Sequence, residues 1–254
     1  MESLAVISCI FGTKFKYVYP APLPNNCFFF TNNPELKKEI ITSNWEYIYV
    51  PFELSDDYLD SSLQSKYIKF LEFLNDYPDF VFSTIIYVDH KLYLKKEHIK
   101  KLLEQPGDYK ILLRQHESNL TILDEIEEAK SQPRYSETME PIEQIVHSKI
   151  QSKELFADTK THNTGLLMYN NYNQLLPMLH SIYKTCQDYK NPECQIVFEM
   201  VSQPWNQFIK TVPFHSIKII WTNPLPLKIF IIDNYIIIIV LFLLFLKKLK
   251  NLVK

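Results

Sequence analysis

One carboxylate in the sequence stands where an unpaired acid would be costly. Asp89 directly follows residues 85–88, an apolar run with the length and composition of a buried strand. A carboxylate at the end of such a strand is unfavourable unless it binds a cation or hydrogen-bond donors. Mg²⁺ and Mn²⁺ prefer oxygen ligands. Asp89 is therefore a candidate ligand for a metal that accompanies a nucleotide diphosphate, and a structural cap of the next loop is the alternative.

Three further features could serve the same edge of a sheet. Gly12 follows the first apolar run and could bring backbone N–H groups close to a nucleotide, although a plain turn explains it equally well. Lys66 and Lys69 share one predicted helix, where either could reach a phosphate, although surface lysines are usually solvated. His116 comes shortly after another apolar run and adds a titratable imidazole.

Acidic residues later in the chain could take or give a proton. Glu125 and Glu128 are three residues apart on a predicted helix, so they share a face that is either solvated or catalytic. Glu193 and Gln195 open another predicted helix after Pro192, where an acid also suits the helix dipole. Glu125, Glu193 and His116 are the candidate catalytic residues.

Strand-like and helix-like segments alternate along the chain. Such alternation predicts βαβ units. We expect an α/β fold, a Rossmann-like, mostly parallel mixed sheet with helices on both faces, whose ligands bind at the carboxyl ends of the strands. The expected strands are 4–11, 27–31, 45–50, 82–88, 109–113 and 165–169, and the expected helices are 34–41, 63–74, 95–103, 121–130, 138–151, 174–186 and 192–201.

Composition narrows the function classes. The 254 residues are 46% hydrophobic and 22% charged, which is typical of a folded domain, and the net charge of −2 argues against a nucleic-acid partner. Four cysteines without a C-x-x-C pair argue against zinc and favour a reducing compartment. With 3 glycines the chain lacks a Gly-rich cofactor loop, which disfavours an unrelated α/β enzyme such as a methyltransferase.

The segment from 229 to 246 is nearly all Ile, Leu, Phe and Val, and it has about the length of a membrane-spanning helix. The apolar residues outweigh the cost of Asp233, and four lysines follow in the next eight positions. A buried strand or core helix is the alternative. We expect a domain over 1–224, a linker over 225–228, one transmembrane helix over 229–246 and a basic tail over 247–254.

The orientation of this anchor follows from two opposing signals. The lysine-rich tail favours a cytoplasmic C-terminus by the positive-inside rule. Glu2 and the absence of a basic residue before the first apolar run predict no signal peptide, and an anchor inserted after synthesis leaves the domain in the cytosol. A glycan on the sequon at Asn119 would lie beside His116. We therefore expect a membrane protein with a cytosolic catalytic domain.

The order of these motifs resembles a family of plant, bacterial and viral glycosyltransferase-like domains of the nucleotide-diphospho-sugar (GT-A) type. That family has an opening strand that leads to a Gly, a strand ending in F-T-D/N, a Trp, a helix with A-R/K-x-x-K and a strand ending in one Asp. The matching segments span about residues 4 to 205, in the same order. They are 5–12, 28–32, Trp45, 65–70, 85–89, His116 with 124–129, 164–171, 194–196 and Trp205.

The resemblance implies transfer of a sugar from a nucleotide-sugar donor to a glycan, lipid or protein acceptor. It implies that Asp89 positions the diphosphate or its Mg²⁺ or Mn²⁺, and that Lys66 and His116 stabilise charge on the leaving group. Glu125 or Glu193 would activate the acceptor hydroxyl if the reaction inverts. The residues expected to bind the donor are Gly12, Lys66, Asp89 and Gln195.

This chain departs from the family pattern at several positions. His90 and Lys91 follow Asp89, so a second acid of a D-x-D metal motif is missing. Glu193 and Cys194 replace an Arg-Asp pair, and Asn119 replaces an Arg of the family. A catalytically impaired, sugar-binding or partner-binding membrane protein is therefore the alternative function.

Overall fold

The computed structural model describes residues 3–14 and 17–217. They belong to the first of two compact units, Met1–Ile220, and the second unit, Trp221–Lys254, is not described. The expected linker, membrane segment 229–246 and basic tail therefore lie outside the described residues. Within the ranges that are described, no helix is both long and apolar enough to cross a bilayer.

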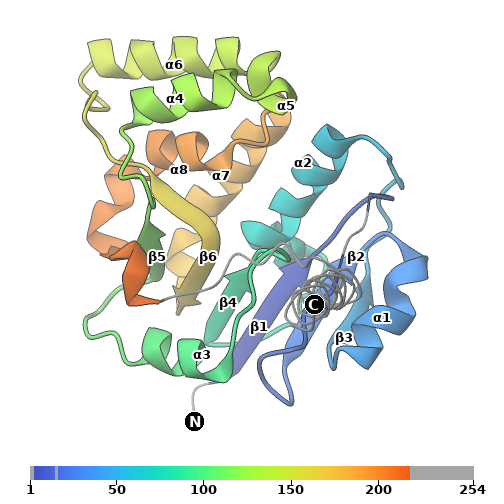
Figure 1. Cartoon of the computed structure of the whole chain (residues 1–254). Coiled ribbons are helices and arrows are strands. Elements are labelled where there is room, and N and C mark those ends of the chain that lie inside the picture. Colours follow the sequence, from blue (N-terminus) through green and yellow to red (C-terminus); the bar gives the residue numbers. More distant parts are fainter. Residues whose placement is uncertain (1–2, 15–16, 218–254) are drawn as a thin grey trace, which may run out of the picture. The chain divides into compact units, whose positions relative to one another are not determined.

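Seven strands form one mixed sheet in the order β3-β2-β1-β4-β6-β5-β7 (Figure 1). β6 runs antiparallel to both of its neighbours, and the other described pairs are parallel. The strands are β1 (Leu4–Cys9), β2 (Cys27–Thr31), β3 (Glu46–Tyr49), β4 (Thr84–Val88), β5 (Ile111–Gln115), β6 (His162–Asn170) and β7 (Ile209–Val212). The predicted α/β class and mostly parallel mixed sheet are confirmed.

Helices cover both faces of the sheet, as expected (Figure 1). They are α1 (Lys37–Thr42), α2 (Tyr58–Lys69), α3 (Lys96–Leu103), α4 (Ile122–Lys130), α5 (Pro133–Ser136), α6 (Met139–Gln151), α7 (Leu176–Asp188) and α8 (Cys194–Ser202). Alternate residues of the strands point to opposite faces. Thus Ile7 belongs to the core cluster that includes residues of α2 and α4–α8, whereas Val6 belongs to the cluster that includes residues of α1 and α3.

The sheet brings distant segments to one edge. β1, β2 and β4 are parallel, so their carboxyl ends lie together. β6 is antiparallel, so its beginning, near His162, lies at this same edge beside the end of β5. Asp89 therefore stands at the end of a central strand, next to the first residues of β6.

One predicted helix has different bounds in the structure, and one strand of the sheet was not predicted. The helix expected over 63–74 is α2, Tyr58–Lys69, which starts earlier because the Asp57 side chain caps it by accepting the N–H of Leu59. It ends before Leu71, whose left-handed φ of 58° stops a helix. Strand β7 was not expected, because its four residues, IKTV, give too short a pattern for a strand.

Candidate active site

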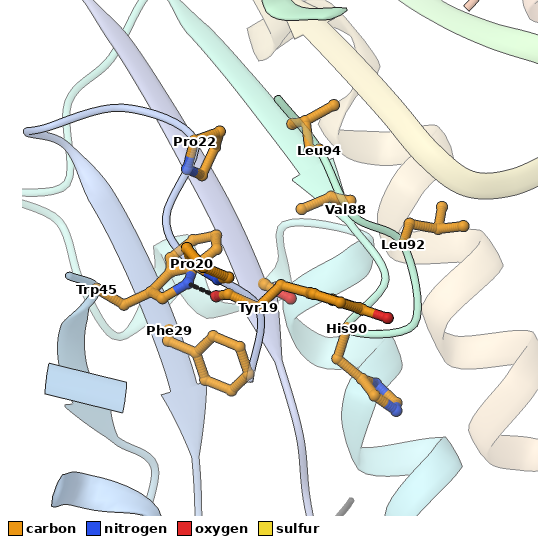
Figure 2. A pocket seen from close by; sticks show the side chains of 10 residues that line it. Tyr19, Pro20, Pro22, Phe29, Trp45, Val88, His90, Leu92 and Leu94 are labelled. Atoms are coloured by element: carbon orange, nitrogen blue, oxygen red, sulfur yellow. Dashed lines mark hydrogen bonds between the residues drawn. The ribbon is translucent and has the colours of Figure 1, made fainter. Parts of the chain in front are cut away.

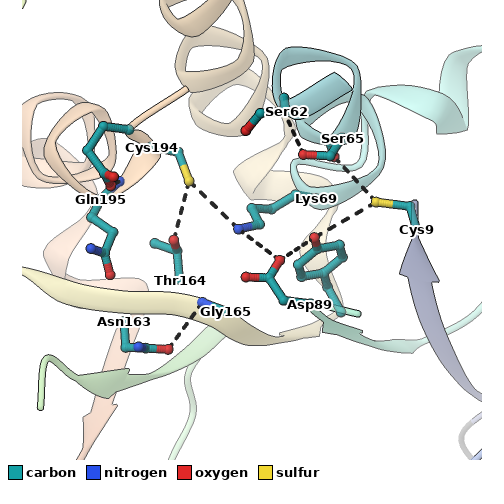
Figure 3. A network of polar contacts seen from close by, with 12 residues as sticks. Cys9, Ser62, Ser65, Lys69, Asp89, Asn163, Thr164, Gly165, Cys194 and Gln195 are labelled. Atoms are coloured by element: carbon teal, nitrogen blue, oxygen red, sulfur yellow. Dashed lines mark hydrogen bonds and ion pairs between the residues drawn. The ribbon is translucent and has the colours of Figure 1, made fainter. Parts of the chain in front are cut away.

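Asp89 accepts two donors through one carboxylate oxygen (Figure 3). The Tyr87 hydroxyl donates to Oδ1 at 2.6 Å, and Lys69 Nζ lies 3.2 Å from the same oxygen. Lys69 is 5% exposed, whereas Asp89 is 33% exposed. The alternation of side chains along β4 places Tyr87 on the face of Asp89. The cluster is therefore a buried ammonium held by a carboxylate that still reaches solvent.

The charges in this cluster are fixed at neutral pH. Burial alone would raise the pKa of Asp89, but the charge of Lys69 and then the bond from Tyr87 lower it below its usual value. Burial likewise would lower the pKa of Lys69, and Asp89 raises it instead. Burial and the nearby Asp89 raise the pKa of Tyr87 well above its usual value, so its hydroxyl remains a neutral donor.

Lys66 lies one helical turn before Lys69 on α2, so the two lysines share a helix face. Lys66 is 5% exposed, and among the described residues no hydrogen-bond or ion-pair partner is found for its ammonium. Its charge contributes to the low pKa of Asp89, which places it in the same electrostatic environment. The Lys66 side chain is largely buried, but its Nζ is not among the fully buried atoms without a partner, so the ammonium is open to an anionic ligand.

The first turn of α8 closes onto Lys69 (Figure 3). Cys194 Sγ lies 3.7 Å from Lys69 Nζ and 3.3 Å from the Thr164 hydroxyl. The Glu193 side chain caps this helix by accepting the N–H of Gln195, as its position after Pro192 predicts. The predicted residues Glu193 and Gln195 are therefore neighbours of the Lys69 cluster.

Gln195 and His116 converge on a second carboxylate, Glu125. Gln195 Nε2 donates to Glu125 Oε1 at 2.8 Å, and His116 Nε2 lies 3.8 Å from Oε2. Oε2 is buried and has no hydrogen-bond donor among the described residues. α4 begins at Ile122, and its N-cap Thr121 forms a capping box with Asp124. This cap fixes the first turn of the helix, which carries Glu125.

The environment of Glu125 favours its protonated form. Burial and then the charges of Glu193 and Glu128 raise its pKa to about 7. A carboxyl with such a pKa exchanges a proton near neutral pH, which suits a general acid or base. Sequence spacing places Glu125 on a helix face with Glu128, but the contribution of Glu193 comes from the fold.

Gly12 has a structural role that the sequence left open. Its φ is +81°, and an added Cβ would lie 2.1 Å from Ser61 Oγ on α2. Its N–H donates to Asn32 Oδ1 at 2.9 Å, and its carbonyl accepts from Asn33. Gly12 thus lets the loop after β1 approach α2, the helix of both lysines, while its own N–H is already engaged.

A buried guanidinium supports the edge of the sheet beneath Asp89. Arg114 is fully buried, donates from Nη2 to Asn163 Oδ1 at 3.1 Å and stacks 4.7 Å from the ring centroid of Phe214. Asn163 Oδ1 also accepts the N–H of Gly165. An added Cβ at Gly165 would lie 3.1 Å from Asp89 Oδ2, so the absent side chain leaves this oxygen room.

Two cavities lie away from these side chains. One of about 10 Å³, enough for about one water, is lined by aromatic residues and His90 (Figure 2). Trp45 donates to the Tyr19 carbonyl at 2.6 Å there, and burial lowers the pKa of His90 to about 4. A groove of about 670 Å³ lies between α6, α7 and α8 beside Trp205. None of the predicted site residues lines either cavity.

The surroundings of Asp89 offer few ligands to a divalent cation. Among the described residues, its hydrogen bonds and its ion pair engage Oδ1, which leaves Oδ2. His90 and Lys91 stand in place of a second acid, and no metal-binding group of three His, Cys, Asp or Glu side chains occurs in residues 3–14 and 17–217. This donor set does not form a protein-held site for such a cation.

Several contacts of the site could not be predicted from the sequence. Lys69 rather than Lys66 pairs with Asp89, and only the lysine spacing on one helix pointed to it. Tyr87 could have been found from its position two residues before Asp89 in a strand. Cys194 and Thr164 carry no local signal, because they meet Lys69 only in the folded sheet.

No protein-family model matches the chain, and no curated protein matches its sequence. Solved structures do resemble it. The mouse xyloside xylosyltransferase 1 is 11% identical, with a TM-score of 0.43, over 82% of this chain and 84% of that one. A glycosyltransferase involved in glycosylation of the major capsid of PBCV-1 is 10% identical, with a TM-score of 0.37, over 83% and 82%.

Glucosyl-3-phosphoglycerate synthase from Mycobacterium tuberculosis is 7% identical, with a TM-score of 0.40, over 84% of this chain and 70% of that one. Its structures contain UDP with Mn²⁺ or Mg²⁺, the ions that the sequence resemblance implies. Because all these TM-scores are below 0.5, we transfer no residue role from these proteins. They are sugar-transferring enzymes of the class that the sequence resembles.

Proposed function

We propose that the chain is a glycosyltransferase that moves a sugar from a nucleotide-sugar donor to a hydroxyl of a glycan, lipid or protein acceptor. One observation carries the proposal. Two buried lysines beside Asp89, one of them unpaired among the described residues, adjoin a carboxyl whose pKa is about 7. The first residues of α8 contact both groups, through Cys194 and Gln195.

The lysine side of the site suits the donor. Lys66 and Lys69 can meet the diphosphate as point charges and stabilise the negative charge that grows on it as the sugar leaves. Asp89 holds the Lys69 ammonium in place, while Oδ2 remains for a hydroxyl of the donor. Gly12 supports this side through the packing of its loop against α2.

The glutamate side suits the acceptor. Glu125 accepts the proton of the acceptor hydroxyl, either directly or through the imidazole of His116. The acceptor oxygen then forms a bond to the anomeric carbon as the bond from that carbon to the phosphate oxygen breaks. The nucleoside diphosphate leaves with the electron pair. Gln195 orients Glu125, and Glu193 raises its pKa.

A binding protein without transferase activity is the second candidate. The observation that favours it is the sequence Asp89-His90-Lys91, which lacks the second acid of a D-x-D motif. Such a protein would bind a sugar nucleotide or a partner through the same lysines. It would not need Glu125 to titrate near neutral pH, and this separates the two functions.

We also propose that residues 229–246 attach the protein to a membrane as one helix, with the domain in the cytosol. The support is the length and apolar composition of the segment together with the lysines after it. Carbonate extraction of the full-length protein tests the attachment, since a spanning helix resists it. Glycosylation at Asn119 would place the domain on the other side.

A thermal-shift experiment with a panel of nucleotide sugars, each with and without Mn²⁺, tests the donor. A ligand at about one hundred times its dissociation constant stabilises the protein by about 2.7 kcal/mol. We expect one donor class to raise the melting temperature. S-adenosylmethionine serves as the control for an unrelated α/β enzyme, and stabilisation by it alone would contradict the proposal.

A further inference from the structure

The carboxylate expected to hold a metal already holds an ammonium. Lys69 Nζ lies 3.2 Å from Asp89 Oδ1, and the Tyr87 hydroxyl occupies the same oxygen at 2.6 Å (Figure 3). A divalent cation on Asp89 would stand beside this buried ammonium, and like charges at such distances repel strongly where water is scarce. The pair therefore competes with a cation for the carboxylate.

The same face of α2 carries a second ammonium group, that of Lys66. Lys66 is on the face of α2 that holds Lys69, the two residues are 5% and 4% exposed, and no partner for Lys66 is found among the described residues. Its Nζ is not among the fully buried atoms without a partner, so this ammonium, free of an anion in the part of the chain that the structure describes, is open to one from solution. Residues three apart on a helix are neighbours on its surface, so the two lysines can act on one anionic group.

We propose that Lys66 and Lys69 take the place of the divalent cation, so that the donor diphosphate binds without Mg²⁺ or Mn²⁺. The inference rests on the proposed function. In it, Asp89 is a positioning residue that fixes Lys69, and the phosphate oxygens are the anions that Lys66 lacks. Lysine binds phosphate as a compact charge and needs no second carboxylate. The missing acid after Asp89 then has a physical reason.

Calorimetric titration with UDP, GDP, CDP and ADP, in EDTA and in Mn²⁺, tests the proposal on the whole chain. We expect at least one of them to bind with dissociation constants that agree within about threefold in the two buffers. Binding that needs Mn²⁺, with at least a tenfold loss in EDTA, would overturn the inference and leave the proposed function standing. Absence of binding in both buffers would overturn the proposed function as well.

Variants at the two lysines sharpen the test. Lys66→Met should weaken binding in EDTA at least tenfold without loss of melting temperature, because it removes a charge that has no partner among the described residues. Lys69→Met should also weaken binding in EDTA, and it frees Asp89, so Mn²⁺ should restore part of the affinity. A merely structural role of Lys69 would not create such a metal dependence.

Lys101→Met is the matched control, since Lys101 is an exposed lysine on α3. It should bind in EDTA as the wild type does. Unchanged binding by Lys66→Met and Lys69→Met in EDTA would overturn the inference even if the nucleotide binds without metal, because the charge would then come from other residues.

Discussion

The fold places two carboxylates of this site in opposite environments. Asp89 keeps its charge, because Lys69 and Tyr87 both bind one of its oxygens and lower its pKa. Glu125 has a neutral amide on one oxygen, Glu193 nearby and a pKa raised to about 7. One cluster holds fixed charges, and the other exchanges a proton near neutral pH.

This difference separates two tasks within one site, anion binding and proton transfer. A permanent ion pair suits an anionic ligand, whereas a carboxyl with a raised pKa suits proton transfer. Pairs of carboxyls whose environments shift their pKa values in opposite directions are typical of acid–base sites. The first turn of α8 joins both, since Cys194 contacts Lys69 and Gln195 contacts Glu125.

The largest effect should follow loss of the titrating carboxyl. Glu125→Gln should lower kcat for transfer about 10²-fold to 10⁴-fold, the usual contribution of a general base, and remove the pH dependence near pH 7. Steady-state kinetics over pH 5 to 9 measure both. Glu127→Gln, at an exposed position on α4, is the control and should leave the rate nearly unchanged. An equal loss of kcat in both variants would contradict the role of Glu125 as general base.

The stability of the protein should fall as pH rises through the titration of Glu125. The folded protein holds this proton up to about pH 7, whereas the unfolded chain releases it near the usual value of 4.5. Unfolding between these values releases a proton, so its stabilising effect is complete below pH 4.5 and lost above pH 7.

The pKa difference corresponds to about 3 kcal/mol of unfolding free energy between pH 4.5 and pH 8. Urea unfolding measures it, and Glu125→Gln should lack this pH-dependent loss. If the wild type and the variant show the same pH dependence of stability, Glu125 titrates normally and the contrast with Asp89 disappears.

Breaking the ion pair should be asymmetric. Asp89→Asn leaves Lys69 buried without an anion and should cost about 2 kcal/mol, less than a fully buried pair because Asp89 is partly exposed. Lys69→Met leaves a carboxylate that water can reach and should cost less. Urea midpoints compare the two variants, and a larger loss in Lys69→Met would show that the packing of the lysine chain outweighs its charge.

The smallest effect concerns coupling between the two clusters. Lys69 and Glu125 share no direct contact among the described interactions, so their effects on stability should add within about 0.5 kcal/mol. A double-mutant cycle of Lys69→Met and Glu125→Gln measures the coupling. A value well above this would mean that α8 transmits strain between the clusters and that they act as one unit.

Much of the fold could be predicted from the sequence, because hydrophobic periodicity reports which faces are buried. The strand over Cys27–Thr31 and the position of Asp89 after β4 followed from local pattern. The pairing of β6 with β4 and β5 did not, since strand order depends on contacts between distant segments.

The candidate site divides in the same way. Asp89 and Glu125 were predicted from position and helix spacing, and the structure brings His116, Glu193 and Gln195 around Glu125. The partner of Asp89 could not be chosen between two lysines one turn apart on the same helix face, because the choice depends on the packing of α2. The engaged N–H of Gly12 also depends on tertiary contact.

The most direct measurement is release of the nucleoside diphosphate when the protein meets the donor selected by the panel, with acceptor glycans and with water alone. Wild-type protein should release it, faster with its acceptor, and Glu125→Gln should bind the donor equally but release it at least about a hundredfold more slowly. Donor binding without any release, or equal release by wild type and Glu125→Gln, would contradict the assignment of transfer to these two clusters.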